Sequence, residues 1–159
     1  MNDQDFFVKM VLDNWQGQIN AMSKLLDKLT DEQLMNAIAP ARNRGIYLLG
    51  HLIAVHDLML PLLRFEEVIY PDLQPVFVDA PDRSFETIPP SKILRNQWSA
   101  INEKLLTHFV GLQTADWFTR HANVSEEDFA KEPKRNRLNV VIGRTSHLTY
   151  HRGQLILLT

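Results

Sequence analysis

Four long segments of the chain repeat apolar residues with the 3.6-residue period of an α-helix, and no stretch shows a convincing β-strand alternation. These segments cover residues 3–29, 44–65, 91–109 and about 139–158. We expect Ser91 and Asn139 to be the N-caps of the last two, and Thr30 with Gln33 to form a capping box that starts a short helical turn. The pattern therefore predicts an all-α fold.

Two long connections join these segments. The one between the second and third helices contains Pro71, Pro75, Pro81 and Pro89 and is too long for a tight turn, so it should cross over along the bundle. The other, about residues 111–138, should contain a short helix near residues 114–118. This order predicts a single domain, residues 1–159, that is a four-helix bundle but not a simple up-down-up-down one.

Composition narrows the classes of partner and site. The 159 residues are 45% hydrophobic and 23% charged, as in a globular soluble domain. A formal net charge of -2 argues against nucleic acid as the main partner. The chain has no cysteine, so disulfides, thiolate metal sites and a cysteine nucleophile are excluded, and a metal must take histidine, carboxylate or water ligands.

One stretch, residues 46–63, is apolar enough to resemble a membrane span, but it carries His51, His56, Asp57 and Pro61. An aspartate near the centre of a span costs ~2.5–3.5 kcal/mol on insertion scales. We therefore expect a buried helix and no membrane partner. The first residues lack the basic and apolar regions of a secretory signal, so the expected location is cytoplasmic.

His147 and His151 stand four residues apart in the last segment. On a helix they lie about 6 Å apart along the axis and roughly 40° around it, so both imidazoles can reach one cation. His51 lies on the core-facing stripe of the second helix and is the best third ligand. A lone histidine on an apolar face is more often a hydrogen-bonded core residue. Three histidines in one small core each need a partner for their buried ring nitrogens, and one shared metal ion would provide it for all three.

The other histidines fit such a site less well. His56 lies about 140° around the helix from His51 and should point elsewhere. His121 falls in an expected loop. His108 lies on the apolar stripe of the third helix, but at its end, which makes it a weaker fourth candidate.

Three polar residues near the histidines leave alternatives open. Asn14 and Gln18 interrupt the apolar stripe of the first helix, and either are structural polar residues or line a pocket and orient the imidazoles. Arg144 lies one turn before His147. It either contacts an anionic substrate or is a surface arginine.

At these residues the chain resembles the DinB-like superfamily. The resemblance rests on GHLI at residues 50–53 and on HLTYHRGQL at residues 147–155. It implies a DinB-like four-helix bundle with an up-down-down-up arrangement, often a homodimer, and a divalent metal that is nickel, zinc or iron in different members. The three ligands it implies are His51, His147 and His151.

Some members of that superfamily are transferases or isomerases that use low-molecular-weight thiols such as bacillithiol or mycothiol. The leading interpretation is therefore a metal-dependent thiol S-transferase, because a metal-coordinated thiol is deprotonated and can attack an electrophile. A non-catalytic metal-binding or stress-associated bundle and a structural dimer with core histidines remain as alternatives. Apolar pairs such as Phe6 with Phe7, and the run 156–158, favour a homodimer that covers them.

Overall fold

The computed structural model describes residues 2–159 and is built from helices. Within that range there is no β-strand, so the expected all-α class is confirmed. The elements are α1 (Asp3–Lys28), α2 (Asp31–Met35), α3 (Gly45–Asp57), α4 (Met59–Leu62), α5 (Leu73–Phe77), α6 (Ser91–Gly111), α7 (Thr114–Trp117), α8 (Glu126–Lys131), α9 (Arg137–Leu155) and the 3₁₀ helix η1 (Ile156–Leu158).

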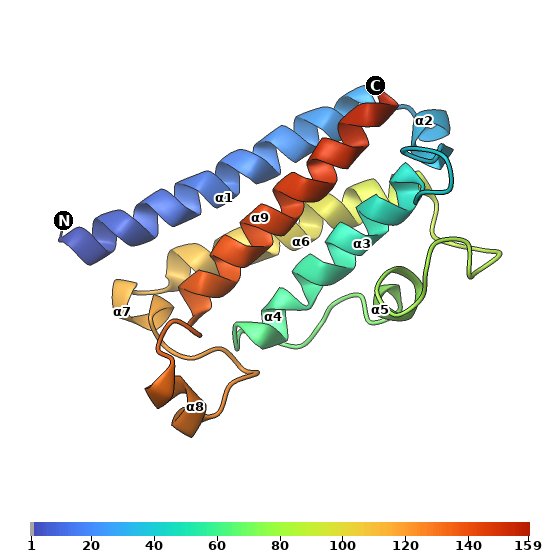
Figure 1. Ribbon diagram of the computed structural model, residues 1–159. Coiled ribbons are helices and arrows are strands. Elements are labelled where there is room, and N and C mark those ends of the chain that lie inside the picture. Colours follow the sequence, from blue (N-terminus) through green and yellow to red (C-terminus); the bar gives the residue numbers. More distant parts are fainter. Residues whose placement is uncertain (1) are drawn as a thin grey trace.

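The four long helices α1, α3, α6 and α9 lie lengthwise beside one another, with α1 and α9 running one way and α3 and α6 the other (Figure 1). Contacts at the helix ends agree with these directions. The Gln33 side chain, just after α1, donates to the Leu158 carbonyl at the end of the chain's last helical segment. Arg95, near the start of α6, donates to carbonyl oxygens at the end of α1. The connection from α3 to α6 therefore runs back along the bundle.

Two predicted helix starts are wrong by one to three residues. The N-cap of α6 is Pro90, and Ser91 is already helical. The N-cap of α9 is Asn136, whose side-chain oxygen accepts a hydrogen bond from the Asn139 backbone at 2.9 Å, so the helix begins earlier than expected. The capping box of Thr30 and Gln33 is present as predicted.

The second predicted helix, residues 44–65, is shorter and divided. It breaks at Leu58 into α3 and α4. Pro61 has no N–H to donate to the carbonyl four residues earlier, which weakens the helix at this point. The crossover and the second connection contain α5 and α8, two short helices that the periodicity did not predict.

Helix α3 is the most buried of the four long helices. Eleven of its thirteen residues are buried, and the two that are only half-buried are Tyr47 and His51. The window Gly45–Leu62 has a mean hydropathy of 1.4 and the length of a membrane span, but 72% of it is buried inside the protein. That burial is typical of the core helix of a folded domain.

The crossover is anchored at both ends of α3. The Arg44 guanidinium pairs with Asp82 at 2.7 Å at one end. At the other end the buried Asp57 carboxylate accepts hydrogen bonds from the backbone N–H groups of Ile69 and Tyr70. A buried carboxylate needs such partners, so Asp57 fixes the start of the crossover against the end of α3.

The apolar residues that motivate a homodimer remain uncovered on the chain. Phe6 and Phe7 are 53% and 48% exposed, and Leu157 is 65% exposed. Leu158 differs, because it is half-buried and its side chain packs against Gly45 at the start of α3. The homodimer stays a prediction.

His56 is the most deeply buried histidine. Its ring lies 4.9 Å from that of Trp15 and 5.2 Å from that of Trp98, and its Nδ1 bonds to the Asn102 side-chain oxygen at 2.9 Å. Burial is the main cause that lowers its pKa to about 3. His56 is therefore a neutral core residue at pH 7, turned away from His51 as predicted.

This burial predicts a pH dependence of stability. Below pH 6.5 the unfolded chain takes up a proton at His56 that the folded protein does not accept until about pH 3. Acidification over that window should therefore favour unfolding, by roughly 1 kcal/mol per pH unit from this group. Urea unfolding at pH 7 and pH 5 measures the slope, and the non-titrating variant His56→Gln should lose that share of it. An unchanged slope would contradict the prediction.

Candidate metal centre

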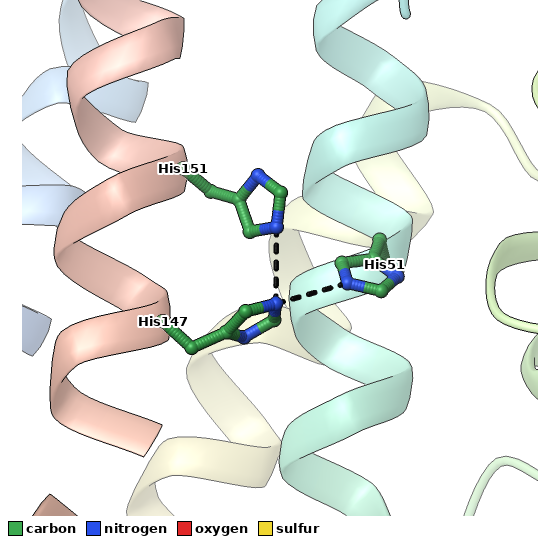
Figure 2. A group of neighbouring side chains, drawn as sticks. All are labelled: His51, His147 and His151. Atoms are coloured by element: carbon green, nitrogen blue, oxygen red, sulfur yellow. Dashed lines mark hydrogen bonds between the residues drawn. The ribbon is translucent and has the colours of Figure 1, made fainter. Parts of the chain in front are cut away.

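The structure brings His51, His147 and His151 together between α3 and α9 (Figure 2). One ring nitrogen from each lies within 4.8 Å of the others, so the three form a cluster that could hold a metal ion. His147 lies in the middle: its Nε2 is 3.2 Å from Nε2 of His51 and 3.0 Å from Nε2 of His151. The three rings meet edge to face and are half-buried.

Acceptors outside the cluster orient two of the three rings. Nδ1 of His51 donates to the backbone carbonyl of Phe77 at 2.7 Å, and Nδ1 of His151 donates to the side-chain oxygen of Gln154 at 2.7 Å. With the proton on Nδ1, each Nε2 presents its lone pair to the centre of the cluster. This is the tautomer that metal-ligating histidines adopt when a carbonyl accepts from the other nitrogen.

The Phe77 carbonyl can reach His51 because Gly50 lets the crossover approach α3 closely. A Cβ atom at Gly50 would lie 2.5–2.6 Å from three atoms of the buried Phe77 ring. Only glycine allows that contact without a shift of α5. The neighbouring Tyr47 adds a second tie, since its hydroxyl donates to the Ala80 carbonyl at 2.7 Å and its ring stacks near that of His51.

The donor geometry fits a divalent metal ion. Two nitrogens that each lie ~2.1 Å from one zinc ion are ~3.0 Å apart at right angles and ~3.4 Å apart at the tetrahedral angle. The separations of 3.2 and 3.0 Å around Nε2 of His147 fall within that range. Without an ion, Nε2 of His51 and Nε2 of His151 each direct a lone pair at the cluster, and Nε2 of His147 has at most one proton to donate to them. One lone pair would then have no partner. Shared coordination would satisfy all three.

The imidazoles are kept neutral, as ligation requires. Burial is the largest cause that lowers the pKa of His51, His147 and His151, and burial together with the neighbouring positive charges lowers that of His147 to about 4. The positive charge of Arg144 lowers the pKa of His51 and His147 further. Protons therefore compete with a metal for these nitrogens less than they would at a freely exposed histidine.

The remaining candidates lie in different places. Asn14 is exposed and lines a groove of about 420 Å³ between α1 and α9, on the side of Thr145 and Ser146. Gln18 is half-buried, and its side-chain oxygen has no partner among residues 2–159. Arg144 is half-buried near the histidines.

Two further histidines stay outside the cluster. His108 bonds to Glu66 at 2.6 Å, with its ring stacked on Phe65. His121 lies in the loop between α7 and α8, as expected. Neither therefore serves as a fourth ligand in this arrangement.

Two groups that orient the ligands were not recognised in the sequence. Gln154 lies three residues after His151, and its spacing on a helix could have indicated the contact. The Phe77 carbonyl could not have been found, because a backbone group gives no signal in the side-chain pattern.

Comparison with known proteins gives no family assignment: no family model matches the chain, and no curated protein matches it in sequence. The geometry of the histidine cluster therefore carries the functional argument.

Gly50→Ala tests the link between the crossover and the cluster. We expect the added methyl group to displace Phe77 and cost about 1–3 kcal/mol of stability. The loss of the carbonyl partner of His51 should also weaken metal binding about tenfold. Urea unfolding and calorimetric metal titration measure the two effects.

Gly17→Ala is the matched control, since nothing lies within 4 Å of its added Cβ in α1. It should leave metal affinity unchanged and raise stability by up to ~1 kcal/mol. Equal behaviour of the two variants would disprove the role assigned to Gly50.

Proposed function

We propose that this chain is a DinB-like protein that binds one divalent metal ion through His51, His147 and His151 and acts as a metal-dependent thiol S-transferase. The observation that carries the proposal is the meeting of three neutral imidazoles with nitrogen separations of 3.0 and 3.2 Å. Nickel, zinc and iron all accept imidazole ligands. The thiol is a low-molecular-weight compound of the bacillithiol or mycothiol type.

Three protein ligands favour catalysis over a purely structural role, because catalytic sites keep a coordination position open whereas structural zinc sites are closed by four ligands. An ion bound there would lower the pKa of a coordinated thiol and hold it as the thiolate. The chain's own residues fix the three donors: Phe77 and Gln154 hold two rings in the ligating tautomer. In the transfer a carbon–sulfur bond forms, the bond to the leaving group breaks, and the thiol proton passes to solvent.

The resemblance of residues 50–53 and 147–155 to DinB-like proteins supports the same proposal. The order of helix directions, with α1 and α9 opposed to α3 and α6, also agrees with the up-down-down-up arrangement of that superfamily. The metal-binding part rests on geometry, whereas the transferase part rests on this resemblance.

Metal titration tests the ligand set. Chelator-stripped protein titrated with zinc or nickel should bind one ion per chain, and His51→Ala, His147→Ala and His151→Ala should each weaken binding at least tenfold. His121→Ala is the control, because that histidine lies in the loop between α7 and α8 and is not part of the cluster. It is cleaner than His56→Ala, which would open a cavity between two tryptophans. Equal losses in all variants would contradict the assignment.

A conjugation assay tests the transferase. Metal-loaded protein with a small thiol and an activated aryl chloride should form the thioether and release chloride faster than the His147→Ala variant, which lacks the central ligand. Stoichiometric metal binding without any rate increase would overturn the transferase and favour a non-catalytic metal-binding bundle. Absence of metal binding would favour the structural alternative.

A further inference from the structure

Arg144 is a charged group beside the histidine cluster. Within residues 2–159 its guanidinium makes no ion pair and no hydrogen bond to another residue, and burial alone lowers its pKa. Arg137 and Arg152 are also half-buried with an unpartnered Nε, but Arg144 is the arginine whose charge acts on the clustered histidines. A desolvated charge without a partner is unfavourable unless something pairs with it.

Its position on α9 directs Arg144 toward the cluster. It precedes His147 by three residues and His151 by seven, so it lies on the same stripe of the helix, ~4.5 Å before His147 along the axis. Its charge lowers the pKa of His51 on the facing helix as well as that of His147. The guanidinium therefore acts on histidines from both helices that form the cluster.

Within the described residues 2–159, no acidic side chain balances this charge. The pKa of each clustered histidine is shifted by burial, by positive charge or by a neutral hydrogen-bond acceptor, and none is raised by a carboxylate. A divalent ion held by three neutral imidazoles would keep its full charge beside that of Arg144. The negative charge must then come from the ligand.

We propose that Arg144 binds the carboxylate of a small ligand whose other donor atom takes the open coordination position of the metal. The planar guanidinium matches a carboxylate with two parallel hydrogen bonds. The short helical separation from His147 favours a carboxylate only a few bonds from the donor atom. This inference rests on the proposed function, but it replaces the bacillithiol or mycothiol type named there with a smaller thiol that carries a carboxylate near its sulfur.

Cobalt-loaded protein tests the inference through the thiolate-to-cobalt charge-transfer band. The probes are 3-mercaptopropionate and the uncharged 2-mercaptoethanol. Wild type should bind 3-mercaptopropionate at least about tenfold more tightly, as expected for a charge-assisted pair. Arg144→Gln should lose that preference and keep its affinity for 2-mercaptoethanol, and Arg144→Lys should retain part of it. Circular dichroism checks that each variant is folded.

Arg152→Gln is the matched control. It removes the same charge from the same helix, but Arg152 lines a groove with Lys24 and Lys28 of α1. It should keep the preference for 3-mercaptopropionate. Loss of the preference in both variants, or no preference in wild type, would overturn the inference and show at most an effect of net charge.

Succinate separates this inference from the proposed function. Suppose that neither thiol gives a band, but succinate changes the cobalt d–d spectrum of wild type and not that of Arg144→Gln. The thiol chemistry would then fail while the carboxylate site stands. If both thiols bind equally and succinate has no effect, the carboxylate site fails while thiol binding stands.

Discussion

The close approach of the crossover to α3 supports the candidate site more than any other contact. Gly50 leaves room for the Phe77 ring, and the Phe77 carbonyl then accepts the Nδ1 proton of His51. Arg44 with Asp82 and the Asp57 carboxylate hold the two ends of the same segment. A long connection costs conformational entropy, and these contacts offset it while they fix one imidazole.

The burial of α3 decides where chemistry is possible on that helix. Its partly accessible residues are Tyr47 and His51, one turn apart, and both contact the crossover. His56 on the same helix is enclosed by Trp15 and Trp98 and has a pKa of about 3. The two histidines of α3 therefore have different surroundings: His56 packs between two tryptophan rings, whereas His51 faces His147 and His151.

The sequence was sufficient to locate the four long helices and to pair His147 with His151, because both follow from local periodicity, but it did not predict the short helices α5 and α8. It was weaker at helix ends: the N-caps are Pro90 and Asn136, whereas the sequence pattern predicted Ser91 and Asn139. The sequence predicted the ends of α3 least well, because a helix that is apolar on all sides has no distinct hydrophobic face. The partner of His51 is a backbone carbonyl 26 residues away. No side-chain pattern can indicate such a contact.

The placement of carboxylates explains why the site would be electrophilic. Asp57 is occupied by backbone N–H groups, Asp82 by Arg44, and Glu66 by His108 and Lys104. These acids anchor the crossover and the ends of helices, and none contributes to the histidine cluster. An ion bound by three neutral imidazoles beside Arg144 would therefore keep its charge undiminished by the protein. A thiolate or carboxylate is the ligand best able to compensate that positive charge. Because the carboxylates of the protein are engaged elsewhere in the fold, the site would accept an anionic molecule.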